Sequence, residues 1–426
     1  FAPTGTLAQT ISNNTISVRS GVATGAIQGI IVEGTTGNST TTLNISDNDF
    51  NTIGHTVTGN AAITLISNAM ASLNQNINNN TFTNINCNNN GSFTFISNNI
   101  SLPTGGTQNV NSNSIVTAFN KTGAGGTVTV FTTNGSSVAG TTVNNNNNNF
   151  SNITVTGATA ITGWSNTDGG SPTKTIQNNT FSNWVGGTSL IQGMVLSFSG
   201  SSTFSGNTVS NITSAGAITG ISTGSGTDNL FSNTVHTLST TGASAVTGIA
   251  VTSGTAKNIY KNKIYNLQSN NASGTVNGIL VSSGTTVNIY NNLIGDLRTP
   301  SSNAANPLNG LNITGGTTVN VYYNSVYLNA TSTGALFGSS AVSASTSPAL
   351  TLKNNIFVNL STPVGATGYT VAYRRSSTTL TSYGANSNNN LFFAGTPGAN
   401  NLIFSNGTNL LQTLANYKAL SGLAPR

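Results

Sequence analysis

Three consecutive stretches decide the fold of this chain: TGIAVTSGTAKNIYKNKIYNL at 247–267, NGILVSSGTTVNIYNNLIGDL at 277–297 and NGLNITGGTTVNVYYNSVYL at 309–328. Each stretch holds a short alternating run, a turn with glycine, a second alternating run, a turn with asparagine and a third short run. Alternation puts the apolar side chains of a strand on one face. The runs are too short and too rich in β-branched residues for helices. Each stretch therefore predicts three short strands.

The asparagine of this pattern recurs along the whole chain, followed two residues later by an apolar residue, at intervals of 26 to 35 residues. The thirteen asparagines are Asn14, Asn48, Asn80, Asn113, Asn148, Asn179, Asn207, Asn233, Asn262, Asn292, Asn324, Asn355 and Asn390. Such a repeat is typical of a solenoid, in which each unit buries its apolar face only against a neighbour. Parallel strands joined by crossovers are nearly always right-handed. We therefore predict an all-β fold, a single-stranded right-handed parallel β-helix of about 13 coils.

The recurring asparagines are expected to stack at one corner of the coils as a structural ladder. Each side-chain amide can donate to one neighbouring layer and accept from the other, while the asparagine backbone takes the left-handed turn conformation. Glycine takes positive φ without steric cost, so a second corner is expected at Gly254, Gly284 and Gly315. The opposite corner is expected at the glycine that precedes the first strand of a repeat. These glycines are Gly193, Gly220, Gly248, Gly278 and Gly310.

The repeat loosens towards the C-terminus. Residues 1–360 are predicted to form the parallel β-helix, and residues 361–426 the last irregular coils and a capping segment of the same domain. The leucines and tyrosine of Asn409–Leu420 have helical spacing, which predicts a short helix over the last coil. Such a helix would cover open strand edges. The chain opens without a methionine or a signal peptide, so we expect a processed piece of a longer precursor.

Charged residues make up only 4% of the chain, and the net charge of +6 reflects scarce acids. Two small basic groups, Lys257 with Lys261 and Lys263, and Arg374 with Arg375, are expected to be solvated surface cations. They are too sparse for a nucleic-acid interface. Cys87 is the only cysteine, which excludes an intramolecular disulfide and predicts a small buried side chain. We expect no cofactor, no structural metal and no membrane span, because the required ligand spacings and apolar stretch are missing from the sequence.

Catalysis by acid and base requires suitably placed carboxylates. Only six acidic residues occur, and Asp47 and Asp49 are the two that lie close together, in the run SDND. On an extended segment they could hold one calcium ion or act as an acid–base pair, which makes them weak metal candidates. The competing interpretation is a polar turn. His55 and His236 lack the partners of a nucleophilic site. We expect no catalytic residues.

Aromatic residues offer a possible platform for sugar rings. The candidates are Trp164, Trp184, Tyr260, Tyr290, Tyr322, Tyr323 and Tyr327. Three of them, Tyr260, Tyr290 and Tyr322, occur at the same place in successive repeats. That recurrence favours an aromatic stack along the solenoid over a binding platform.

Three further segments carry a resemblance to a known family: GTTVNVYYNSVYLNATSTG at 316–334, LTLKNNIFVNLSTP at 350–363 and VAYRRSSTTLTSYG at 371–384. With the repeats quoted above, they resemble the β-helical repeats of very large secreted surface proteins of Bacteroidota and related bacteria. The similarity is close from about Thr247 to Leu420 and looser before. It implies an extracellular or cell-surface location and export by type IX secretion, although no sorting domain follows Leu420.

The expected function is that of a non-enzymatic extracellular structural protein. The β-helix would act as a filament subunit, a stalk or an adhesin on the cell surface, and copies of it could assemble head to tail. Its expected partners are other copies of itself and cell-surface or matrix polysaccharide. Two alternatives remain open: a polysaccharide-active enzyme of the pectin-lyase-like fold, and a glycan-binding or ice-binding module.

Overall fold

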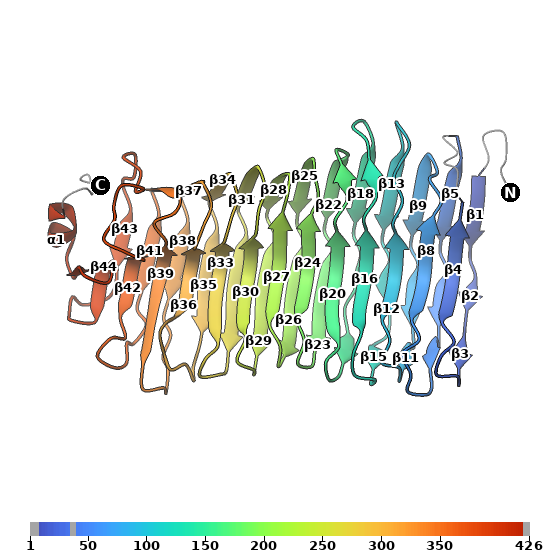
Figure 1. Ribbon diagram of the computed structural model, residues 1–426, viewed down its shortest axis with the longest axis horizontal. Helices are drawn as coiled ribbons and strands as arrows, with labels where there is room; N and C mark the ends of the chain where they lie inside the picture. Colours follow the sequence, from blue (N-terminus) through green and yellow to red (C-terminus); the bar gives the residue numbers. More distant parts are fainter. Residues whose placement is uncertain (1–7, 35–39, 421–426) are drawn as a thin grey trace. The chain divides into compact units, whose positions relative to one another are not determined.

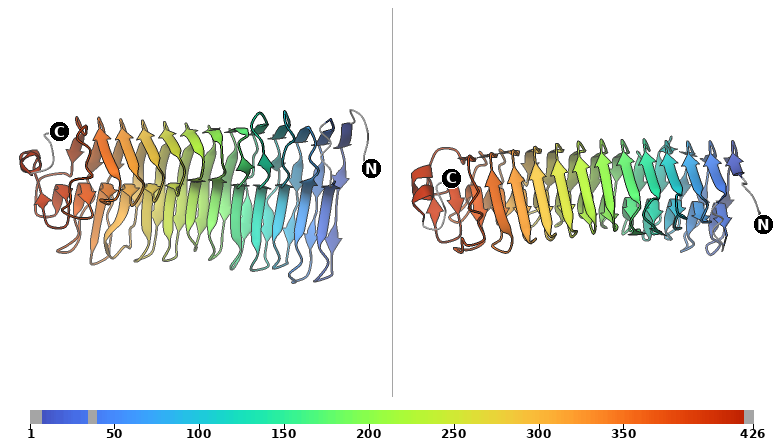
Figure 2. Two further views of the ribbon diagram at one scale, coloured as in Figure 1. Left: turned by 45° about the horizontal axis from the view of Figure 1, so that its top comes forward. Right: turned by 90° about the horizontal axis from the view of Figure 1, so that it is seen from above.

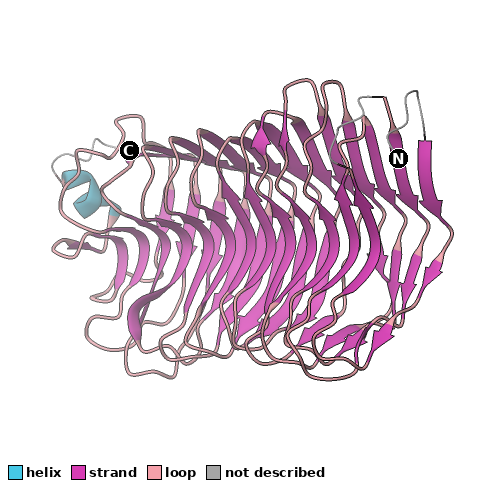
Figure 3. Cartoon of the chain, turned by 45° about the vertical axis from the view of Figure 1, so that its right-hand side comes forward, coloured by secondary structure: helices cyan, strands magenta, loops and turns pink. Residues whose placement is uncertain are grey.

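The computed structural model of the 426-residue chain describes residues 8–34 and 40–420. Strands make up nearly all of the regular structure in this described part, and one short helix, α1 (Leu414–Ala419), lies near the C-terminus (Figures 1 and 3). Two compact units are present. The N-terminal unit is Phe1–Ser214 with Ser225–Thr227, and the C-terminal unit is Ala215–Gly224 with Asp228–Arg426. The prediction that residues 1–360 and 361–426 belong to one domain stays a prediction.

Each unit is a parallel β-solenoid whose coils contribute in turn to three sheets, here called sheets 1, 2 and 3. In one coil the three strands are β30 (Ala245–Val251), β31 (Ala256–Tyr260) and β32 (Lys263–Ser269), as the first quoted stretch predicts. Counted over both units there are about 13 turns, which confirms the predicted fold. The right-handed winding stays a prediction.

In the N-terminal unit, neighbouring strands of each sheet come from successive coils (Figure 2). Sheet 1 contains β4 (Ile27–Glu33), β8 (Ile63–Ala69), β12 (Phe93–Asn98), β16 (Thr127–Thr133), β20 (Ala160–Asn166) and β24 (Ile191–Ser197). Sheet 2 contains β1 (Ala8–Ser12), β5 (Thr42–Ser46), β9 (Asn74–Asn78), β13 (Thr107–Asn111), β18 (Thr142–Asn146), β22 (Thr173–Gln177) and β25 (Ser201–Ser205). Sheet 3 contains β11 (Asn86–Cys87), β15 (Phe119–Lys121), β19 (Ile153–Val155), β23 (Thr180–Val185) and β26 (Thr208–Ser214).

Shorter strands of this unit pair into three small sheets. They are β2 (Thr15–Ile16), β6 (Asp49–Asn51), β10 (Thr81–Thr83) and β14 (Ser114–Ile115) in one sheet, β3 (Arg19–Ser20) with β7 (Gly54–His55), and β17 (Ser136–Ser137) with β21 (Gly169–Gly170).

The C-terminal unit repeats the plan. Sheet 1 contains β27 (Ile218–Gly224), β30, β33 (Thr275–Val281), β36 (Ala304–Ile313), β39 (Phe337–Ala344), β42 (Thr370–Arg375), β44 (Asn401–Ser405) and β45 (Leu410–Leu411). Sheet 2 contains β28 (Thr227–Phe231), β31, β34 (Thr286–Tyr290), β37 (Thr318–Tyr322) and β40 (Ala349–Lys353). Sheet 3 contains β29 (Thr234–Thr240), β32, β35 (Leu293–Arg298), β38 (Ser325–Leu328), β41 (Ile356–Asn359) and β43 (Leu391–Phe393).

The core consists of apolar columns that run from coil to coil inside each unit. Ile249 pairs in register with Ile279, which pairs with Leu311, and all three side chains are fully buried. Fully burying such a side chain stabilises a fold by about 1.5–3 kcal/mol. Because the same contact recurs in every coil, the alternation in the sequence is enough to set the register.

The left-handed backbone at the asparagine corner belongs to a different residue from the one predicted. The residue immediately before each recurring asparagine takes positive φ: Asn13, Asp47, Asn79, Ser112, Asn147, Asn178, Gly206, Ser232, Lys261, Asn291, Tyr323, Asn354 and Asn389. With the turn one residue earlier, eleven of the thirteen asparagines, from Asn48 to Asn355, have buried side chains, whereas Asn14 is exposed and Asn390 is half-buried.

The glycine predictions are wrong in two places. All five glycines expected at the opposite corner lie inside strands of sheet 1: Gly193, Gly220, Gly248, Gly278 and Gly310. A Cβ atom on Gly248 would come within 2.6 Å of Ile264 Cγ2, so the glycine gives this core side chain room. At the predicted corner, Gly254 and Gly284 have positive φ, but in the next coil Gly316 takes this role in place of Gly315.

The end of the C-terminal unit differs from the predicted helix over Asn409–Leu420. Leu410–Leu411 form β45, which pairs antiparallel with β44, and only Leu414–Ala419 are helical. Thr413 caps the helix by accepting from Asn416 N at 3.3 Å. The buried ring of Tyr417 packs on Phe392 and Phe404, with centroid distances of 5.6 and 5.3 Å. The helix therefore contacts the last strands through one aromatic anchor.

Candidate functional site

The most extensive side-chain arrangement in the molecule is the stack of recurring asparagines. Within each unit, the Nδ2 atom of one asparagine donates to Oδ1 of the next. In the N-terminal unit these bonds run from Asn14 through Asn48, Asn80, Asn113, Asn148 and Asn179 to Asn207, at 2.8 to 3.0 Å. In the C-terminal unit they run from Asn233 through Asn262, Asn292, Asn324 and Asn355 to Asn390, at 2.8 to 3.0 Å. We call this arrangement the inner ladder.

Asn292 shows how completely each rung is bonded. Its Nδ2 donates to Ile259 O at 2.8 Å and to Asn324 Oδ1 at 2.9 Å. Its Oδ1 accepts from the Nδ2 and the backbone N of Asn262, both at 3.0 Å. A side-chain amide has two donor hydrogens and two acceptor sites, so all four are used. With 2% of its surface exposed, Asn292 has nothing left for a ligand.

A second ladder, which the sequence analysis missed, lies four residues before the first. In the N-terminal unit, Asn144 donates to Asn109, Asn109 to Asn76, and Asn76 to Asn44, at 2.8 to 3.0 Å. Its bonds run towards the N-terminus, opposite to those of the inner ladder. In the C-terminal unit the same position carries Asn229, Asn258, Asn288 and Asn320, bonded at 2.9 Å. These part-buried residues form the outer ladder, and its signal was the asparagine two residues before the first tyrosine in each quoted stretch.

Asp47 and Asp49 do not form a paired carboxylate site. Asp47 is exposed and takes φ 57°, the left-handed turn position. Asp49 accepts from Asn51 at 3.1 Å, from Thr81 at 3.0 Å and from Thr83 at 2.8 Å. Among the described residues, no three His, Cys, Asp or Glu side chains gather to hold a metal ion. The geometry is that of the polar turn.

Two of the cations expected at the surface, Lys257 and Arg375, lie in the interior instead. Lys257 is fully buried against Asp228, which also accepts from Thr223. Burial lowers the pKa of Lys257, and the charge and hydrogen bond of Asp228 oppose that shift. Arg375 is 2% exposed and donates to Tyr373 Oη at 3.0 Å. Lys257 occupies the inward position that Val287 occupies in the next coil, so aligning the quoted stretches could have revealed its burial.

Cys87 and Lys121 pair in register on the inner side of sheet 3. Burial raises the pKa of the Cys87 thiol to about 12, although Lys121 lowers it in part. Lys121 donates to the carbonyl oxygens of Gly123 at 2.6 Å and Gly125 at 2.7 Å. Burial also lowers the pKa of Lys121. A thiol with so high a pKa stays protonated at neutral pH and is a poor nucleophile.

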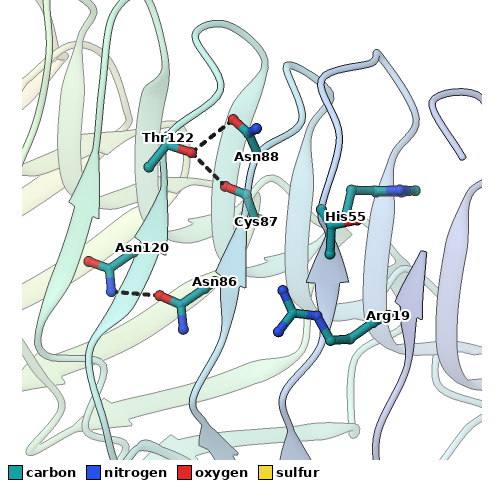
Figure 4. Close-up of a pocket in the computed structure, with 8 residues that line it drawn as sticks. Arg19, His55, Asn86, Cys87, Asn88, Asn120 and Thr122 are labelled. Carbon is teal, nitrogen blue, oxygen red and sulfur yellow. Dashed lines mark hydrogen bonds between the residues drawn. The ribbon is translucent and has the colours of Figure 1, made fainter. Parts of the chain in front are cut away.

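A surface hollow of about 190 Å³ lies next to this pair and is lined in part by Arg19, His55 and Asn86 (Figure 4). His55 is 1% exposed, and neither of its ring nitrogens has a hydrogen-bond partner in the described part of the chain. On the same wall, Asn120 donates to Asn86 Oδ1 at 2.9 Å. The lining supplies one guanidinium and several amides but no carboxylate, so it lacks an acid–base pair.

The two tryptophans are core residues. Trp164 and Trp184 are fully buried. Trp164 stacks on Phe131 at a centroid distance of 3.9 Å, and Trp184 Nε1 donates to Phe150 O at 2.8 Å. Neither is available as a platform for sugar rings.

The tyrosines of the C-terminal unit stack only in part. Tyr260 stacks on Tyr290 with a centroid distance of 4.7 Å and an interplanar angle of 5°. Tyr322 is in register with Tyr290. The Tyr322 ring borders a surface hollow of about 430 Å³, which is also lined by Tyr290 and Tyr323. Tyr323 is 58% exposed and Tyr327 is 47% exposed. His236, the second histidine, stacks on Tyr265 at 4.8 Å.

Comparisons of the chain with protein-family models, curated proteins and solved structures found no match. In the described residues, no helix is long and apolar enough to span a membrane.

Proposed function

We propose that this chain is a non-enzymatic structural module of an extracellular or cell-surface protein, in which the solenoid acts as a stiff spacer. The observation that carries the proposal is the inner ladder, whose buried amides bond coil to coil through each unit. Buried polar groups that are fully bonded favour one rigid arrangement. The most regular set of side-chain contacts in the molecule therefore holds its own coils together.

The proposed location follows from the resemblance to secreted surface proteins of Bacteroidota, and type IX secretion is the export route that this resemblance implies. Within this class of function, the chain would serve as a stalk, an adhesin shaft or a filament subunit. Parallel coils expose strand edges at the end of a stack, which permits head-to-tail contact between copies.

Electron microscopy and sedimentation of the purified chain over a wide concentration range test this proposal. The expected result is stiff particles of uniform width, and a length that grows with concentration identifies a filament subunit. Flexible particles of variable width would contradict the spacer role. Turnover of a polysaccharide in a broad glycan panel, lost when Asp47 and Asp49 are replaced by Asn, would also contradict it.

One observation favours a second candidate, a glycan-binding module. The hollow beside Tyr290, Tyr322 and Tyr323 combines aromatic faces with the amides of Asn288 and Asn291. Sugar rings stack on aromatic faces and bond to amides, so a neutral polysaccharide is the fitting ligand.

Affinity electrophoresis through gels that contain neutral polysaccharides tests this candidate. Retardation should be lost in Tyr323→Ala and kept in Leu293→Ala, a matched change of another exposed side chain. Equal migration of the wild type in gels with and without polysaccharide would count against binding.

A further inference from the structure

Three side chains at one buried corner of the N-terminal unit form a group that the structural role does not require. Asn166 ends β20, Lys174 lies in β22, and Asp168 lies between them in the chain. Lys174 Nζ is 2.8 Å from Asn166 Oδ1 and 2.7 Å from Asp168 Oδ2. Lys174 and Asn166 are fully buried, and Asp168 is 4% exposed. An amine, a carboxamide and a carboxyl group thus meet away from water.

The corner holds these groups in fixed positions. Asn166 Oδ1 also accepts from Asp168 N at 3.2 Å, and Asp168 Oδ1 accepts from Thr133 at 2.8 Å. The ring of Phe198 covers the amine, with its centroid 3.7 Å from Lys174 Nζ. Each reactive group is therefore oriented by a separate contact, as pre-organised reactions require.

The Nδ2 atom of Asn166 stands out because it is buried and has no hydrogen-bond partner among the described residues. A buried donor without a partner costs free energy, so such groups are rare in folded proteins. If a nucleophile attacked the carboxamide carbon, Asn166 Nδ2 would be the leaving atom, and no hydrogen bond to a described residue holds it in place.

Another coil fills the same corner with neutral amides. The register places Gln75 opposite Gln108, and Lys174 follows in the same column after Val143. There, Asn98 donates to Gln75 Oε1 at 3.0 Å, a contact between two amides that satisfies the corner without charge. The corner can therefore be filled and hydrogen-bonded without a lysine and an aspartate.

We propose that Lys174 and Asn166 condense into an intramolecular isopeptide bond, with Asp168 as the proton carrier. Lys174 passes one proton to Asp168, which leaves a neutral amine and a carboxylic acid. The amine nitrogen forms a bond to Asn166 Cγ, and the bond from Cγ to Nδ2 breaks. The departing nitrogen takes a proton through Asp168 and leaves as ammonia, so the step needs no oxidant or cofactor.

Burial favours this chemistry on physical grounds. Removing water penalises the charged pair relative to the neutral pair, and a desolvated lysine is the nucleophilic form. Contact distances near 3 Å between reacting groups replace a bimolecular encounter with a unimolecular one. The second buried pair is Lys257 with Asp228, where the amine also donates to Gly224 O and the carboxylate accepts from Thr223, and it serves as the internal comparison.

Mass spectrometry of the unfolded full chain tests the proposal directly. The expected mass is below that of the sequence by one ammonia. Trypsin should then fail to cleave after Lys174, because the modified side chain is no longer a cation, and the peptide 122–257 should remain whole. The full sequence mass together with cleavage after Lys174 would overturn the proposal.

Cyclisation of Asn166 onto its own backbone also expels ammonia, and the digest separates the two reactions. A chain that lacks one ammonia but is still cleaved after Lys174 carries the cyclised asparagine, which overturns the isopeptide bond. Lys174→Met and Asp168→Asn should both restore the full sequence mass, whereas Lys257→Met should not. Circular dichroism checks that each variant folds, and the wild-type measurement stands even where a variant does not.

Discussion

Asn262 donates its side-chain amide to Oδ1 of Asn292 at 3.0 Å, one coil further along the chain. Both side chains are buried, at 1% and 2% exposure. The bond joins two coils through groups that would otherwise be left unpaired away from water, which makes it costly to break.

Asn292→Ala should therefore be strongly destabilising. It removes the partners of Asn262 Nδ2 and Ile259 O, and leaves a cavity. Each buried unsatisfied group costs about 1–3 kcal/mol, so a loss of about 2–5 kcal/mol is expected. Asn288→Ala, in the part-buried outer ladder, should cost about 1 kcal/mol. Urea unfolding followed by circular dichroism measures both, and equal losses would contradict the special role of the inner ladder.

Tyr323→Asn should stabilise the C-terminal unit. Tyr323 has φ 56° and an exposed ring, whereas asparagine tolerates the left-handed region. The expected gain is about 1 kcal/mol. Tyr327→Asn is the control because Tyr327 is also exposed at the surface but lies in the strand β38 and not at a left-handed turn position. A gain of the same size in the control would show that loss of the exposed ring, not the backbone, is responsible.

Asp49→Asn should cost about 1 kcal/mol, because the carboxylate accepts three hydrogen bonds and a charged acceptor is stronger than an amide. Asp47→Asn should be nearly neutral, because asparagine suits the left-handed turn. Calcium should leave the thermal midpoint of the wild type unchanged. A rise of the thermal midpoint with calcium that Asp49→Asn abolishes would support a metal site at Asp49.

Lys257→Met should cost about 3–5 kcal/mol, since Asp228 loses its buried counter-charge. Adding Asp228→Leu should recover most of that loss, because replacing both charges with apolar groups is often neutral. Chemical unfolding of the two single variants and the double variant gives the coupling between them. Additive losses would show that the two charges do not depend on each other.

Cys87 should make stability fall with pH in the alkaline range. The pKa of its thiol is raised from 9.0 to about 12 in the folded protein, so the unfolded chain loses this proton first. The stabilising contribution is complete below pH 9 and is lost as the pH rises towards 12. Unfolding midpoints of the wild type and Cys87→Ala should thus converge or cross as the pH rises from 9 to 11. Parallel curves would show that this thiol does not carry the effect.

The fold could be predicted because its causes are local and repeated. The spacing of Ile249 and Ile279 in the sequence is enough to predict both their inward direction and their register. The asparagine ladder followed from the same repetition. The left-handed residue was misplaced by one position, because asparagine occurs both in the turn and in the ladder, as at Asn291 and Asn292, and composition does not tell them apart.

The interior charges were missed because lysine and aspartate are rarely fully buried. Lys174 and Lys257 each stand at an inward position of an alternating strand, and only the alternation shows it. The surface hollows depend on how neighbouring rings and loops are oriented, as at Tyr322 and Tyr323. Such orientations arise from packing between coils, which residue spacing does not encode.

The inner ladder also makes the coils interchangeable. Asn113, Asn148 and Asn179 each receive bonds from the coil before and give the same bonds to the coil after. A segment that runs from one of these asparagines to the next therefore presents the same donors and acceptors at both of its faces. Duplication or deletion of such a segment in the gene keeps the donors and acceptors matched at every junction. The length of the encoded solenoid can therefore change by whole coils without any new kind of contact between coils.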